Sequence, residues 1–113
     1  MAPSELQAMK ADLFRALAHP ARIRILELLA DGERSVHDLQ QTLGLDQPVV
    51  SQHLSALRGR HHVVARKERT LTYYALRSPL VGDLLRVARE FLNQRLTESQ
   101  SMLRELRREG RRS

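Results

Sequence analysis

The chain has 113 residues, of which 42% are hydrophobic and 28% charged, a balance typical of one compact domain over 1–113 and unlike that of a disordered tail. Nineteen basic against thirteen acidic side chains give a net charge of +6, which predicts a polyanionic partner. The absence of cysteine excludes disulfides, thiolate metal sites and cysteine nucleophiles. There is no membrane-length apolar run and no signal-peptide pattern, so we expect a cytoplasmic protein.

Two helices are predicted at the start of the chain. Ser4 and Gln7 have the spacing of a capping box, so a helix is expected over about 4–18. Its apolar residues recur every three or four positions and therefore share one side. A second helix follows over about 20–31, because proline suits a first helical turn and Gly32 suits a helix end. This second helix is dense in Ile and Leu and is expected in the core.

A helix-turn-helix unit is predicted next. Ser35 and Asp38 again have capping-box spacing and start a short helix that Gly44 ends. After a gap of a few residues, a second helix runs from its cap Asp46 to about Gly59. Its apolar face, expected to pack on the domain, carries Val50, Leu54 and Leu57, with His53 as a structural histidine.

A β-hairpin is predicted after these helices. Residues 63–65 and 71–76 are β-branched or aromatic, as in strands, and the charged residues 66–69 lie between them. We therefore expect two strands joined by a basic tip.

A long last helix is predicted from Ser78-Pro79 onwards. Its leucines recur at sevens and fours for longer than one small domain needs, which implies a partner helix. We expect residues 4–18 and 79–106 to be dimerisation helices and residues 104–113 to be a basic, flexible tail. The residues assigned to the dimer interface are Leu6, Met9, Leu13, Leu85, Leu92, Leu96 and Leu103.

These elements predict a mainly α-helical fold with a small β-hairpin, a winged helix-turn-helix that binds double-stranded DNA. Gln pairs well with adenine and Arg with guanine, and an apolar side chain can contact the thymine methyl group. The residues expected to read bases are Gln47, Pro48, Val49, Ser51, Gln52, Ser55 and Arg58. Those expected to bind phosphates are Arg58, Arg60, Arg66, Lys67 and Arg69.

The stretch from Phe14 to Leu76 resembles the ArsR/SmtB family of bacterial winged-helix repressors. The resemblance is carried by LFRALAHPARIRILELLADG, SVHDLQQTLGLDQPVVSQHLSALR and VVARKERTLTYYAL. It implies a homodimer joined through its first and last helices, which binds imperfect palindromes near promoters. Two departures stand out: His61-His62 replaces the family's Gly-Leu, and Arg69 stands where the wing turn often has Gly. The first departure leaves open the path of the chain into the wing.

The resemblance also guides the search for a sensor site. The family's cysteine pair corresponds to Ser35 and His37, which excludes thiolate sensing there, and Leu85 stands in place of a ligating His on the last helix. Imidazole and carboxylate suit Ni²⁺ or Zn²⁺ when thiolates are missing. We keep a non-thiolate metal site as a hypothesis. Its candidate ligands are Asp12, His19, His61 and His62, with Glu5 on the same side as the first two.

The sequence also bears on other classes of function. An enzyme is disfavoured, because the chain has no thiol, no phosphate-binding glycine loop and no convincing nucleophile–His pair. The alternative is a helical protein-interaction module that binds nucleic acid without specificity. An unidentified co-regulator protein is a further partner that the sequence leaves open.

Overall fold

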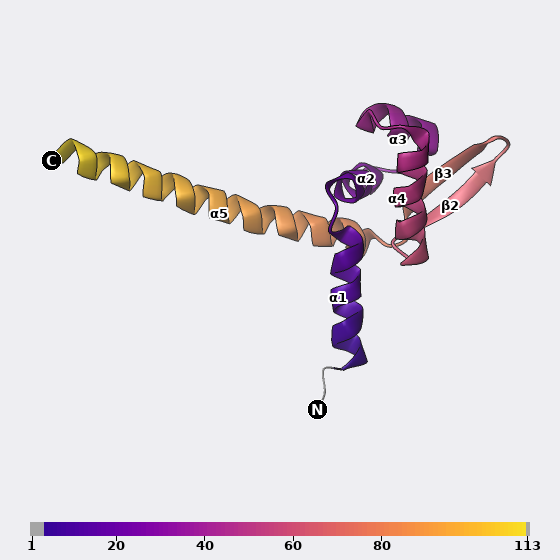
Figure 1. The fold of residues 1–113 in the computed structure, drawn as a ribbon, viewed down its shortest axis with the longest axis horizontal. Coiled ribbons are helices and arrows are strands. Elements are labelled where there is room, and N and C mark those ends of the chain that lie inside the picture. Colours follow the sequence, from indigo (N-terminus) through magenta and orange to yellow (C-terminus); the bar gives the residue numbers. More distant parts are fainter. Residues whose placement is uncertain (1–3, 113) are drawn as a thin grey trace. The chain divides into compact units, whose positions relative to one another are not determined.

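The structure of the protein, a computed structural model, describes residues 4–112 (Figure 1). The chain falls into two compact units, one ending at Gly82 and the other beginning at Asp83. The first unit holds all the helices and strands up to the start of the last helix, and the second is the rest of that helix. No described helix is long and apolar enough to cross a membrane.

The first two helices begin at the residues expected from the sequence. Helix α1 (Glu5–Leu17) is capped by Ser4, whose hydroxyl accepts from the Gln7 amide at 3.2 Å while the Gln7 side chain accepts from the Ser4 amide at 3.0 Å. Helix α2 (Pro20–Ala30) is capped by His19, whose Nδ1 accepts from the Ala21 amide at 3.1 Å. Both caps satisfy amides that have no partner within the helix.

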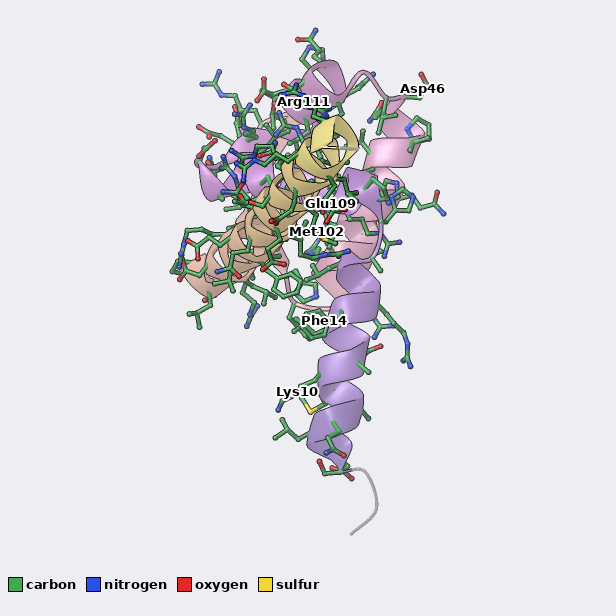
Figure 2. All side chains as sticks on the ribbon, turned by 90° about the vertical axis from the view of Figure 1, so that its left-hand side faces the viewer. Lys10, Phe14, Asp46, Met102, Glu109 and Arg111 are labelled. Carbon is green, nitrogen blue, oxygen red and sulfur yellow. The ribbon has the colours of Figure 1, made fainter. Side chains whose placement is uncertain are left out.

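Helices α3 (Val36–Leu43) and α4 (Gln47–Gly59) form the predicted helix-turn-helix (Figure 1). The Ser35 hydroxyl accepts from the Asp38 amide at 3.0 Å, and Gly44 closes α3 with a φ of 68°, a conformation that glycine adopts without strain. Asp46 occupies the cap position of α4, as Figure 2 shows, but its side chain makes no capping hydrogen bond. Asp46 is therefore the N-cap residue, as predicted, but by its backbone position alone.

A three-stranded antiparallel sheet completes the first unit. Strand β1 (Arg34–Ser35) pairs with β3 (Leu71–Leu76), which pairs on its other side with β2 (Val63–Glu68), in the order β1-β3-β2. Strand β1 was not predicted, because a segment of two residues is too short to show a strand pattern.

The hairpin register corrects the predicted tip. Glu68 pairs with Leu71, so only Arg69 and Thr70 form the turn, and Arg69 has a φ of 59°. Three of the charged residues assigned to the tip belong instead to β2, an edge strand. Edge strands tolerate exposed charges, which block unwanted pairing with another chain.

The core lies between α2, the helix-turn-helix and β2. Its largest fully buried side chains are Ile25, Leu26, Leu39, Leu54, Leu57, Val50 and Val63. Helix α5 (Pro79–Arg112) starts against this unit, since a Cβ at Gly82 would lie 3.4 Å from the Ala30 Cβ and 3.6 Å from the Leu76 Cδ1. Glycine permits that close approach.

The last helix is longer than expected. Residues 104–112, assigned to a flexible tail, continue α5, and Ser113 lies outside the described residues. Arg, Leu and Glu dominate this segment, and all three have high helix propensity. The mainly helical winged fold predicted from the sequence is confirmed.

Candidate nucleic-acid interface

Helix α4 has two sharply different faces. Val50, Leu54 and Leu57 are fully buried, with 0% of their surface exposed, so the packed face is the predicted one. The opposite face is open to solvent apart from Ser51, which is half-buried. Its exposed residues are Gln47, Pro48, Val49, Gln52, Ser55 and Arg58. All of the side chains predicted to read bases therefore share the outer side of one rigid helix.

Polar contacts fix α4 and its C-cap against the first two helices of the chain, α1 and α2. The Arg22 Nε donates to the Nδ1 of His53 at 3.1 Å, and the His53 ring lies 4.4 Å from that of His19. Arg60 forms an ion pair with Asp12 of α1. Burial, followed by the nearby charges of His19 and Arg22, lowers the pKa of His53. The predicted structural role of His53 thus agrees with its contacts.

The path from α4 into the wing depends on the two adjacent histidines. His61 takes the left-handed conformation with a φ of 64°, although it is not glycine. His62 is only 5% exposed, its amide donates to the Leu57 carbonyl at 3.0 Å, and its carbonyl accepts from the Arg77 amide at 3.0 Å. His62 is therefore a buried residue at the junction between α4 and β2.

His62 is held there at a cost. Its Nε2 is buried without a hydrogen-bond partner among the described residues. Burial, then the charges of Arg60 and His61, lowers the pKa of this imidazole. A neutral ring is thus favoured at the junction between α4 and β2.

Arg66 of the wing is already occupied by carboxylates. Its Nη2 donates to the Oε1 of Glu33 at 2.6 Å and its Nη1 to the Oε2 of Glu68 at 2.7 Å. Its guanidinium also lies 4.8 Å from the centre of the Tyr73 ring. The Arg66 hydrogen bond is the main cause that lowers the pKa of Glu33, and both carboxylates raise the pKa of Arg66. Glu33 was not predicted as part of the site, because nothing in the spacing links positions 33 and 66.

Lys67 and Arg69 are the free cations of the wing. Both are exposed, and within residues 4–112 neither takes part in any of the ion pairs found. Lys67 pairs with Thr72 near the end of the hairpin, and Arg69 lies in its turn. Of the wing residues predicted to bind phosphates, these two are available to do so.

A polar cavity of about 300 Å³ adjoins the outer face of α4. Gln47 and Ser51 of α4 line it together with residues from the start of α3 and from the hairpin. Its other lining residues are Val36, His37, Gln40, Thr70, Leu71, Thr72 and Tyr74. The helix-turn-helix and the wing therefore present one continuous polar surface, which the sequence could not show because these residues lie far apart in the chain.

The candidate metal ligands do not come together in one chain. Asp12 pairs with Arg60, His19 uses Nδ1 to cap α2, and His62 is buried. No group of three His, Cys, Asp or Glu side chains able to hold a metal ion occurs in the part of the chain that the structure describes.

The predicted dimer residues are largely uncovered. On α1, Leu6 and Met9 are more than half exposed and Leu13 is half-buried. On α5, Leu92, Leu96 and Leu103 are more than half exposed and Leu85 is half-buried. Phe14, which was not among the residues assigned to the dimer interface, is 56% exposed, and Figure 2 shows it on the side of α1. Each helix thus has an apolar stripe without a partner within its own unit.

Comparisons with known proteins agree with this geometry. Residues 19–60 match the model of "Bacterial regulatory protein, arsR family". The chain is 40% identical over 111 residues to the uncharacterized HTH-type transcriptional regulator Rv0081 of Mycobacterium tuberculosis, covering 97% of each. It is 39% identical over 79 residues to a probable mercury resistance operon repressor of Streptomyces lividans, covering 70% of this chain and 63% of the relative.

Solved structures give the same result. The crystal structure of M. tuberculosis Rv0081 superposes with a TM-score of 0.78 at 42% identity, covering 84% of this chain and 96% of that one. The homodimeric winged helix-turn-helix DNA-binding domain Mb0332 from Mycobacterium bovis superposes with a TM-score of 0.74 at 31% identity, covering 82% and 86%. The chain therefore belongs to the arsR family of bacterial regulatory proteins, and it is a DNA-binding transcriptional regulator, not an enzyme.

Proposed function

We propose that this protein represses transcription as a homodimer that occupies an imperfect palindrome within a promoter. The observation that carries the proposal is the division of α4 into a fully buried apolar face and an exposed polar face. A helix held so rigidly can enter the major groove with its polar side chains in a fixed register. As a regulator of bacterial promoters, the protein would act in the cytoplasm.

The polar face would supply the sequence readout. Gln47 and Gln52 can each pair bidentately with adenine, and Arg58 can do so with guanine. Val49, which is 39% exposed, can contact a thymine methyl group. Ser51 and Ser55 add short hydroxyl groups, which can both donate and accept hydrogen bonds. Gln52 is exposed and lies midway between Gln47 and Arg58, so it is the central probe of the set.

The wing would supply the sequence-independent grip. Lys67 and Arg69 are exposed and free of carboxylate partners within residues 4–112. Contacts of this kind to phosphates fix the position of a protein on the duplex without reading its sequence. Arg66 would act differently, as a tie that holds β2 to the Glu33 loop.

A homodimer would account for a palindromic operator, because the two-fold symmetry of the protein matches that of the DNA site. The exposed apolar stripes of α1 and α5 need cover, and the Mb0332 relative is homodimeric. Two-fold symmetry would then place two α4 helices in successive major grooves, about 34–36 Å apart.

Response to Ni²⁺ or Zn²⁺ would need a site built from more than one chain. Asp12, His19, His61 and His62 do not meet within the described part of a single chain. Calorimetric titration of the metal-free dimer with each ion tests this possibility, and no heat of binding would remove it. A co-regulator protein would show as a second component retained by the purified dimer.

Sequencing of the genomic fragments retained by the purified dimer tests the proposed function. We expect a few fragments that share an inverted repeat and that lie in promoters, and we expect a reporter driven by such a promoter to lose expression when the protein is present. Uniform retention of all fragments would favour the alternative, an interaction module with non-specific nucleic-acid binding. A reporter that gains expression would make the protein an activator.

A further inference from the structure

The end of α5 carries half of the net charge of the chain. Residues 104–113 contain five arginines and two glutamates, a net charge of +3, against +6 for the whole sequence. Neither the helix-turn-helix nor the wing includes these residues, and the apolar stripe of α5 does not use their charge. A concentration of charge this high on one short helical segment calls for a physical explanation.

Four of these arginines lie on one face of the helix. Arg104, Arg107, Arg108 and Arg111 follow the spacing of three, four and seven residues that brings side chains together on a helix. All four line one surface hollow of about 180 Å³. Arg104 and Arg107 also line a neighbouring hollow of about 400 Å³, together with Gln100 and Leu103. We name these four residues the arginine stripe; Figure 2 shows Arg111 near its end.

The arginine stripe has no internal counter-charge. Arg104 Nε donates to the Gln100 carbonyl at 3.5 Å, but none of the four takes part in an ion pair anywhere in residues 4–112. Two other helical arginines pair with a carboxylate about one turn away, Arg24 with Glu27 at 3.9 Å and Arg86 with Glu90 at 2.9 Å. Four neighbouring positive charges repel one another, so binding an anion would relieve a cost that folding leaves in place.

The helix dipole accounts for only part of this charge. Cations are favourable in the last turn of a helix, and the effect fades beyond that turn. It can explain Arg111 and, in part, Arg108. Arg104 and Arg107 lie one to two turns further back, where the dipole gives no reason for them.

We propose that the arginine stripe binds the phosphate backbone of double-stranded DNA, as a contact separate from α4 and the wing. The inference rests on the proposed function. From Arg104 to Arg111 the stripe spans about 10 Å at 1.5 Å per residue. A duplex carries one negative charge per about 1.7 Å of its axis, so all four guanidinium groups can find phosphates at once. Arginine binds phosphate bidentately, which suits this use better than lysine.

The composition of the stripe favours a duplex over other polyanions. Proteins that hold single strands stack the bases on aromatic side chains, and residues 92–113 contain no aromatic residue. Protein interfaces centre on buried aromatic or apolar anchors, whereas the hollow that all four arginines line has no apolar residue in its lining. What remains is a backbone contact that is strong, salt-dependent and blind to sequence.

Simultaneous replacement of the four arginines by glutamine tests the proposal, because glutamine keeps the helix propensity and removes the charge. At 0.1 M salt we expect affinity for the operator and for an unrelated duplex to fall by the same factor, about tenfold or more. The plot of log affinity against log salt should become shallower by at least about 2 units. Replacement by four lysines is the matched control and should keep most of the slope. An unchanged slope in the glutamine variant would overturn the proposal.

Cross-linking gives a second test that does not depend on affinity. The chain has no cysteine, so a single cysteine can be introduced and labelled with a photo-cross-linker. Gln100→Cys places it beside the stripe, and Glu98→Cys places it about 160° from position 100 around the helix. We expect duplex DNA to be captured at position 100 and far less at position 98. Equal capture at both positions, or none at either, contradicts a DNA-binding stripe.

The remaining outcomes identify a different role. If sedimentation shows the glutamine variant to be monomeric at the assay concentration, the arginines contribute to the dimer. If the variant loses binding to polyglutamate or single-stranded RNA while its affinity for duplex DNA is unchanged, the arginines bind another polyanion. Either result overturns the proposal. Failure of the proposed function is distinguishable, because it would show as unchanged sequence preference in Gln52→Ala, whereas failure of the stripe shows in the salt slope.

Discussion

Arg66 and Glu33 form a two-pronged ion pair, with the Arg66 Nη2 donating at 2.6 Å and its Nε at 3.2 Å to the two carboxylate oxygens of Glu33. Bidentate pairs of this kind fix orientation as well as charge. Glu33 lies just before β1 and Arg66 in the middle of β2, so the pair joins the two edges of the sheet. The ion pair therefore holds the wing in place. It also makes Arg66 unavailable for a contact with a DNA phosphate.

Arg66→Ala and Glu33→Gln should weaken DNA binding by similar factors, and the double variant should be no worse than either single one. Each change removes the same tie, so their effects are not additive. The salt slope should stay within about half a unit of the wild type for Arg66→Ala, because no phosphate contact is lost. A slope reduced by about 1 unit, with Glu33→Gln neutral, would make Arg66 a phosphate contact.

Gln52→Ala and Arg69→Ala should distinguish base recognition by α4 from phosphate binding by the wing. Gln52→Ala should reduce the preference for the operator over single-base variants by about 1–3 kcal/mol at one position of each half-site. Arg69→Ala should weaken all duplexes alike and make the salt slope shallower by about 1 unit per chain. Competition binding with a set of variant operators measures both. Equal loss of preference in the two variants would contradict the division of roles.

Leu54→Ala should destabilise the fold strongly. Leu54 is 0% exposed beneath α4, and truncation of such a residue leaves a cavity that costs about 2–5 kcal/mol of unfolding free energy. Ser55→Ala, its exposed neighbour, is the control and should change stability by less than about 0.5 kcal/mol. Urea unfolding followed by circular dichroism gives both values. A loss below about 1 kcal/mol for Leu54→Ala would mean that α4 is not packed as the structure has it.

Stability should fall as the pH is lowered below about 6.5. The folded pKa values of His53 and His62 lie below their ordinary value of 6.5, so the unfolded chain binds more protons in this range and acid favours unfolding. The loss should begin near pH 6.5 and end once the pH is below the folded pKa values. Urea unfolding at pH 7.5 and 5.5 measures it.

His62→Leu isolates one of these two contributions. It removes a buried nitrogen that has no partner in the described structure, so stability at pH 7.5 should be unchanged or higher, by up to about 2 kcal/mol. The pH dependence should become smaller at the same time. A His62→Leu variant that is less stable than the wild type at pH 7.5, or whose stability depends on pH as much as that of the wild type, would contradict these expectations.

Leu92→Asp should dissociate the dimer and reduce operator affinity with it. The aspartate would place an unpaired charge in the apolar stripe of α5, which is costly once that stripe is covered. Asn93→Asp, on the neighbouring exposed position, adds the same charge and should leave the dimer intact. Sedimentation and operator binding are the two measurements. A monomeric Leu92→Asp that still binds the operator tightly would refute the coupling.

Local signals in the sequence predicted most of the fold. The capping box of Ser4 and Gln7, the Ser35 cap and the left-handed Gly44 act over three or four residues, so spacing alone reveals them. The buried face of α4 follows from the helical period in the same way. What failed was the hairpin tip, because its limits depend on the pairing of Glu68 with Leu71 rather than on the composition of either segment.

The candidate site was only partly predictable for the same reason. The exposed face of α4 could be read from its period, but the contact of Arg66 with Glu33 joins residues 33 positions apart. Residues with a side chain rarely adopt the left-handed conformation of His61, so this conformation depends on the surrounding structure and could not be predicted from the residue type. Contacts between distant segments thus decided which of the predicted cations remain free.

Hydroxyl-radical footprinting of the dimer on a retained genomic fragment tests the central claim most directly. We expect two protected segments related by two-fold symmetry, their centres about 10–10.5 base pairs apart or a multiple of that, and we expect this protection to weaken in Gln52→Ala at a concentration at which the wild type protects fully. One unsymmetrical protected segment, or protection that follows no sequence and is unchanged by Gln52→Ala, would contradict a dimer that reads an operator through α4.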